Sequence, residues 1–160
     1  MIRESLIGIL VSLLFLVSTS VAADNVANAA MTGDWQGQAR IIVAWSAQKH
    51  LKLQLSIAAD GRVSGKIGDA TLTNGILKKN RSRLGRFLRI KTDYMIEGNL
   101  NGPIIASQKI TRASVKIPLN FDGTKFTGGL HTSGHATGGE ARMKLSASHL
   151  TLTRTEKPSP

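Results

Sequence analysis

The feature that most constrains this chain is the alternation of apolar and polar residues along most of its length. The alternation is clearest over residues 35–45, 51–57, 88–96, 111–121 and 143–147. Successive side chains of a β-strand point to opposite faces, so an alternating segment indicates a strand with one buried face. No window after residue 23 sustains apolar residues at helical spacing. The chain is therefore predicted to be all-β.

Turn residues separate the alternating segments at short intervals. Asp60-Gly61 and Asp122-Gly123 each mark a turn, and Asn101-Gly102 is a strong signal for a two-residue hairpin. The apolar phase slips by one residue at His149, which indicates a β-bulge. Together these signals predict a single small antiparallel up-and-down barrel of about seven to nine strands, with a β-sandwich as the alternative.

The first residues are typical of a secretory signal peptide. Arg3 supplies a positive charge near the N-terminus, residues 6–17 form an apolar run, and small residues follow. The run is shorter than the roughly 20 residues of a membrane-spanning helix, and an uncleaved anchor is the alternative. We expect cleavage after Ala22 or Ala23. The predicted organisation is a signal-peptide helix over residues 1–23, a leader over 24–31, the barrel over 32–154 and a disordered tail over 155–160.

The chain contains no cysteine, which excludes several kinds of site and one kind of membrane anchor. With 160 residues and no Cys, it has no disulfide framework, no zinc-thiolate site, no thiol nucleophile and no lipoprotein anchor. Aromatic residues make up 4% of the chain, which argues against an outer-membrane barrel with its two aromatic girdles. We expect a periplasmic or secreted protein that is not an integral membrane protein after cleavage.

Basic residues dominate the charge, with 21 Lys and Arg against 10 Asp and Glu. The stretch over residues 78–91 contains no acid and seven of the cations: Lys78, Lys79, Arg81, Arg83, Arg86, Arg89 and Lys91. In a turn and the start of a strand, they would form a positive surface for an anionic envelope lipid or polymer. The alternative is a solvated hairpin whose cations protect a barrel edge. Nucleic acid is not expected, because Phe87 is the only stacking residue in the stretch.

Three residues in a Gly-rich segment are candidate metal ligands: His131, His135 and Glu140. Imidazole and carboxylate groups bind Zn or Cu. We nevertheless expect no metal site, because a four-residue spacing aligns two side chains only on a helix and this segment is predicted to be a loop with incidental histidines.

Catalytic motifs lack their companion residues. Ser46 and Lys49 have S-x-x-K spacing without the other motifs of that enzyme class, and residues 61–66 are one residue short of a phosphate-binding loop. No catalytic residue and no cofactor are therefore expected.

Two tripeptides resemble motifs of the lipocalins and related calycin barrels. Gly33-Asp34-Trp35 looks like the G-x-W motif that opens the first strand, and Thr92-Asp93-Tyr94 matches a second lipocalin tripeptide. The resemblance implies an up-and-down barrel that holds a small apolar ligand. It also implies a late Arg over the Trp35 ring, for which Arg154 is the candidate and Arg112 its competitor.

The chain departs from the lipocalin pattern at two places. The second tripeptide falls within an alternating segment, and strands continue to Thr153 where the family has a helix.

These observations predict an exported, non-catalytic binding protein for an apolar or amphipathic, anionic ligand. The partner would be a small amphipathic molecule or an anionic envelope lipid or polymer. The alternative is a filled-barrel interaction protein that uses its basic surface on envelope polymers or a protein partner. An internal cavity of at least about 300 Å³ favours the first function, and a packed interior favours the second.

Overall fold

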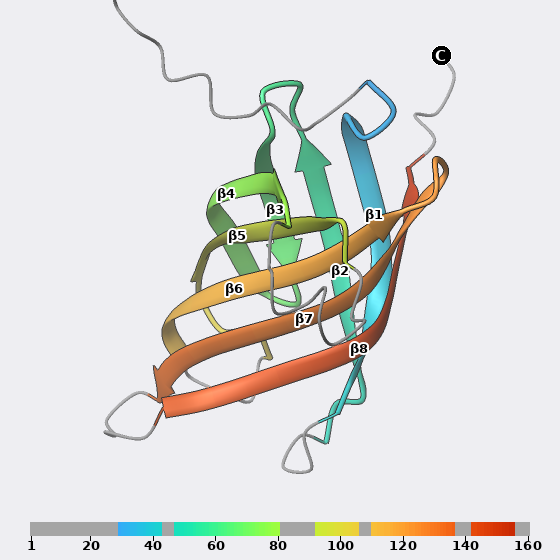
Figure 1. Cartoon of the computed structure of the whole chain (residues 1–160). Coiled ribbons are helices and arrows are strands. Elements are labelled where there is room, and N and C mark those ends of the chain that lie inside the picture. Colours follow the sequence, from blue (N-terminus) through green and yellow to red (C-terminus); the bar gives the residue numbers. More distant parts are fainter. Residues whose placement is uncertain (1–28, 43–46, 81–91, 106–109, 137–141, 156–160) are drawn as a thin grey trace, which may run out of the picture.

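The computed structural model describes residues 29–42, 47–80, 92–105, 110–136 and 142–155. These residues form eight strands: β1 (Gly33–Ile41), β2 (His50–Ile57), β3 (Arg62–Ile67), β4 (Ala70–Lys79), β5 (Tyr94–Asn101), β6 (Ile110–Phe121), β7 (Lys125–Ala136) and β8 (Arg142–Arg154). Each strand pairs antiparallel with the next, and β8 pairs with β1 (Figure 1). The prediction of an all-β up-and-down barrel is confirmed. Within the described ranges, no helix is long and apolar enough to span a membrane.

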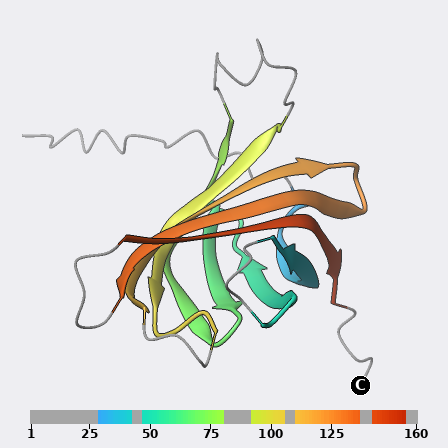
Figure 2. The same cartoon turned by 90° about the horizontal axis from the view of Figure 1, so that it is seen from below.

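An apolar interior holds the barrel together. In β2 the burial alternates strictly, with Leu51 to Ile57 inward at odd positions and polar side chains outward at even ones. Buried apolar side chains from all eight strands form one cluster. Figure 2 shows the strands surrounding this interior. Since burying one Leu or Ile contributes about 1.5–3 kcal/mol, the packed interior is the main source of stability.

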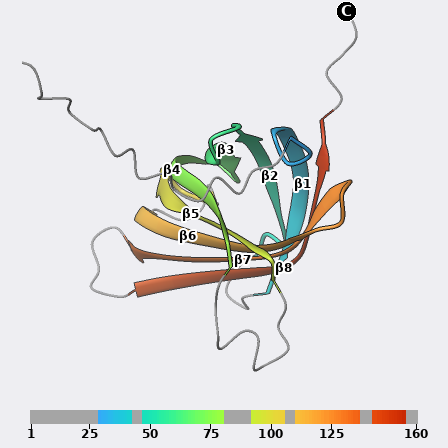
Figure 3. The ribbon, with the colours of Figure 1, turned by 45° about the horizontal axis from the view of Figure 1, so that its top comes forward.

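The barrel has two different ends. The Trp35 end carries the start of β1, the end of β8 and the β2–β3, β4–β5 and β6–β7 connections, and it is turned toward the viewer in Figure 3. The opposite end carries the four other connections. There Ile104 and Ile105, which follow β5, are 1% and 4% exposed. The Asp69 N–H donates to the Ile104 carbonyl at 3.2 Å, which ties this segment to the β3–β4 turn.

β-Bulges shift the inward phase within two strands. His149 has φ +53°, and the pairing of β8 changes register beside it, which confirms the bulge predicted there. Asn74 in β4 also has φ +53°. The buried positions of β4 accordingly change from Leu72 to Leu77, from even to odd.

Two predicted connections are wrong. The segment expected to be a Gly-rich loop is in β7 as far as Ala136, because β6 and β8 pair with it on both sides. Asn101-Gly102 does not close a two-residue hairpin, since β6 begins only at Ile110. Gly102 does turn the chain, with φ +95°, but the segment after it buries Ile104 and Ile105 over the barrel end.

Candidate functional site

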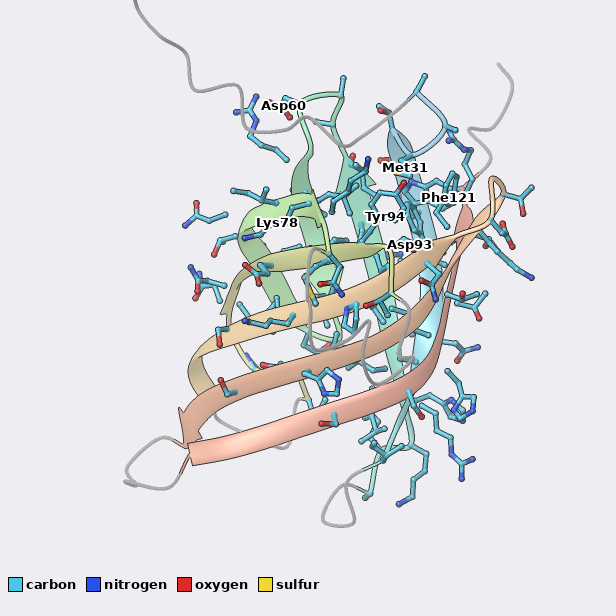
Figure 4. The ribbon with its side chains drawn as sticks, in the orientation of Figure 1. Met31, Asp60, Lys78, Asp93, Tyr94 and Phe121 are labelled. Carbon is cyan, nitrogen blue, oxygen red and sulfur yellow. The ribbon has the colours of Figure 1, made fainter. Side chains whose placement is uncertain are left out.

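Aromatic side chains close the Trp35 end. The Trp35 ring is 1% exposed and packs edge-on against Phe126, with ring centroids 4.7 Å apart, and against Phe121 at 5.9 Å. Its indole N–H donates to the Met31 carbonyl at 2.9 Å. Met31 is itself buried, so the barrel includes this residue of the expected leader. Figure 4 shows Met31, Tyr94 and Phe121 gathered at this end.

Arg154 lies over the Trp35 ring, as the sequence predicts. The two residues are cross-strand partners, and the Arg154 Cζ atom is 5.0 Å from the ring centroid. The guanidinium Nη2 donates to the Ala30 carbonyl at 2.7 Å. A Cβ atom on Gly33 would lie 3.0 Å from Nη1, so the glycine leaves room for the guanidinium. The side chain of Arg112, the competing candidate, lies outside the described residues.

The basic stretch begins at the end of β4, not in a turn. Lys78 Nζ is 2.5 Å from Glu97 Oε2, and Lys116 Nζ is 3.5 Å from Glu97 Oε1. The hydrogen bond from Lys78, followed by its charge and that of Lys116, lowers the pKa of Glu97. Although residues 78–91 contain no acid, Lys78 is therefore paired with an acid of the protein itself. The acid lies on the neighbouring strand, where sequence proximity gives no sign of it.

Lys79 is the other described member of the stretch, and its side chain is exposed. The remaining members lie outside the described residues: Arg81, Arg83, Arg86, Arg89 and Lys91. Figure 4 labels Lys78 on β4 and Asp60 in the turn between β2 and β3.

Hydrogen bonds join the two ends of the β4–β5 connection to each other and to β6. The Asn80 side-chain amide donates to Thr92 Oγ1 at 2.5 Å, and the Asn80 N–H donates to the Asp93 carbonyl at 2.9 Å. The Asp93 N–H donates to Asn120 Oδ1 at 3.0 Å. Thr92 and Asp93 precede β5, so the second tripeptide lies at a strand start and not within a strand as expected.

Two of the candidate metal ligands, His131 and His135, lie four residues apart on β7. His131 points outward, and its Nδ1 is 3.1 Å from Ser146 Oγ. Four residues of strand span about 13 Å, too far for His131 and His135 to bind one ion. The His135 side chain and Glu140 lie outside the described residues. Within the part of the chain that is described, no group of three or more His, Cys, Asp or Glu side chains is placed to hold a metal.

Three grooves on the outer surface were not predicted from the sequence. One, of about 520 Å³, lies beside the β4 bulge and is lined by Arg62, Asn74 and Ile76 among others. A second, of about 440 Å³, is lined mainly by the amides and hydroxyls of β1, β2 and β8. The third, of about 730 Å³, lies at the opposite end and is lined by Arg40, Ile41, Ile42, Lys49, His50, Ser148 and His149.

Comparisons of the chain with protein-family models, with curated proteins and with solved structures find no match. The closed eight-strand antiparallel barrel is compatible with a lipocalin-like fold. The barrel's own interior, ends and surface are therefore the basis for inferring its function.

Proposed function

We propose that this chain is an exported, non-catalytic, lipocalin-like barrel protein that binds anionic partners on its outer surface. The observation that carries the proposal is the filled interior. Side chains at the middle of the barrel, such as Leu53, Ile96 and Ile117, are at most 1% exposed. Trp35 covers one end and Ile104 the other. This packing favours the filled-barrel function over an apolar ligand held inside.

The charge of the outer surface supports an anionic partner. The chain carries a formal net charge of +11, and the outward strand positions include many of its lysines. Clustered cations attract phosphate-bearing lipids and polymers, and salt screens this attraction. In an exported protein, the partner is then an envelope lipid or polymer. The polar outward faces of the strands also support a barrel that faces water, since membrane barrels carry an apolar outer band.

Vesicle binding tests the role of the basic stretch. Lys78 is left unchanged because its salt bridge with Glu97 would confuse the result. The test variant is Lys79→Gln/Arg81→Gln/Arg83→Gln, and a matched control with the same charge loss is Lys52→Gln/Lys66→Gln/Lys125→Gln. Sedimentation with phosphatidylglycerol vesicles measures binding at low and at physiological salt.

We expect the parent and the control variant to bind at low salt and to lose most binding at physiological salt. The test variant should bind at least about tenfold more weakly than the control. If the two variants bind equally, net charge alone explains the attraction and the basic stretch is a solvated edge. If no form binds at low salt, the proposal of an anionic partner is wrong.

A further inference from the structure

The groove at the end opposite Trp35, here called the β1–β8 groove, gathers basic side chains from three strands. Arg40 of β1 pairs with His50 of β2 and with Ser148 of β8. Lys49 and His149 complete the basic lining, and no acidic residue is among the described residues that line it. The groove's volume of about 730 Å³ is within the range of small-molecule sites, about 300–1,000 Å³.

A β-bulge turns His149 into this groove. Leu145 and Ala147 point inward, so uninterrupted alternation would also bury residue 149. Instead, His149 takes φ +53°, which is uncommon for a residue other than glycine, and its side chain is exposed. Ser148 Oγ lies 2.8 Å from His149 Nδ1 and holds the ring. Bulges of this kind commonly re-aim a side chain beside a functional site.

The groove also has an apolar wall. Ile42 is 58% exposed, more than any other large apolar side chain in the described part of the chain, and it lies next to Arg40. An anion with no apolar part would leave this surface uncovered. The combination therefore fits a molecule with an anionic head and an apolar tail.

We propose that the β1–β8 groove binds one molecule of an anionic phospholipid by its phosphodiester group. The Arg40 guanidinium matches two phosphate oxygens, and the Lys49 ammonium adds a second positive charge. The first carbons of an acyl chain lie against Ile42. His50 and His149 line the same groove, where their ring nitrogens can donate further hydrogen bonds to the phosphodiester. The site lies at the other end of the barrel from Lys79 and does not depend on the basic stretch.

Calorimetry with dihexanoyl-phosphatidylglycerol below its micelle concentration tests the site. Dihexanoyl-phosphatidylcholine keeps the chains without the net charge, and glycerophosphoglycerol keeps the charged head without the chains. We expect the first probe to bind at least tenfold more tightly than either of the others. Arg40→Gln/Lys49→Gln should weaken its binding at least tenfold, and the equal charge loss in Lys66→Gln/Lys125→Gln less than twofold.

A further variant tests the apolar wall. Ile42→Ser should weaken binding of the phosphatidylglycerol several-fold and leave that of glycerophosphoglycerol unchanged.

Each contrary result overturns the assignment. If Arg40→Gln/Lys49→Gln and Lys66→Gln/Lys125→Gln weaken lipid binding equally, only long-range electrostatic attraction operates. Glycerophosphoglycerol that binds as tightly as the lipid means a site for free phosphodiesters. Absence of lipid binding by the folded parent removes the site altogether. Because the vesicle test changes the other end of the barrel, either proposal can fail while the other stands.

Discussion

Removing the Arg154 side chain should loosen the Trp35 end by an amount that follows from its contacts. The guanidinium makes a cation–π contact with Trp35 at 5.0 Å and a hydrogen bond to the Ala30 carbonyl at 2.7 Å. Arg154 is exposed, so the cation–π contact contributes about 0.5–1 kcal/mol and the hydrogen bond about 0.5–1.5 kcal/mol. Arg154→Ala should therefore lower the free energy of unfolding by about 1–2.5 kcal/mol. At about 2–4 °C per kcal/mol, this loss is measurable as a shift in Tm.

Urea unfolding followed by circular dichroism is the assay, on the chain that begins at Asp24. A double-mutant cycle with Trp35→Phe isolates the ring contact, and we expect a coupling of about 0.5–1 kcal/mol. Arg62→Ala is the matched control, because Arg62 is an exposed cation paired with Asp60 and should cost less than about 0.5 kcal/mol. If Arg154→Ala costs no more than the control, or if the coupling with Trp35 is zero, the reasoning about this end is refuted.

Four other predictions concern separate parts of the chain. Gly37→Ala should destabilise the barrel by on the order of 3 kcal/mol in urea unfolding, since its Cβ would lie 1.8 Å from the Thr151 carbonyl oxygen. Gly123→Ala meets no atom within 4 Å and costs only the strain of its φ of +99°, so a smaller effect at Gly37 than at Gly123 would contradict this. Thr132 is 6% exposed, and its Oγ1 meets no hydrogen-bond partner among the described residues. Thr132→Val should therefore stabilise the protein by about 1 kcal/mol, and a loss of stability would reveal a hidden partner of Oγ1. Hydrogen bonds from the N–H groups of Thr124 and Lys125 lower the pKa of Asp122 from 3.8 to about 2. The stability this carboxylate contributes is then present above pH 4 and lost as pH falls toward 2; NMR titration should show that midpoint, and Asp122→Asn should flatten the pH dependence of unfolding in this window. The intact mass of the exported protein should correspond to a start at Ala23 or Asp24, and a mass that includes residues 1–22 would contradict cleavage.

Alternation predicted the strands whose phase is unbroken, and it failed where bulges or sparse apolar residues interrupt it. β2 keeps one inward parity throughout, and β6 does so from Ser114 to Leu119, so both were recognised from the sequence. The buried positions of β4 change parity at Asn74 and Gly75, so neither half has an alternation long enough to predict a strand. In β7 the described inward positions include Phe126, Leu130 and Thr132, and Gly and His residues fill much of the rest. This strand forms because its two neighbours pair with it, which is a tertiary effect.

Site residues that depend on cross-strand neighbours were the least predictable. The Trp35–Arg154 contact was expected from the lipocalin resemblance, and closure of the barrel places the two residues opposite each other on the first and last strands. The partner of Lys78 is Glu97, 19 positions along the chain, and only the β4–β5 register places them side by side. Arg40, His50 and His149 meet for the same reason, across β1, β2 and β8. Such groupings follow from strand order and register, which local patterns do not specify.

The filled interior is also what the cysteine-free composition favours on energetic grounds. Disulfides commonly stabilise small domains, and this chain has none. Creating an internal cavity costs about 24 cal/mol per Å³, so a ligand cavity of about 300 Å³ would cost about 7 kcal/mol. The whole stability of a domain is about 5–15 kcal/mol. A barrel without disulfides that kept such a cavity would have little stability left, whereas one that packs Leu and Ile throughout keeps a rigid frame. On that frame, fixed strand register brings Arg40, His50 and His149 to one groove at the surface.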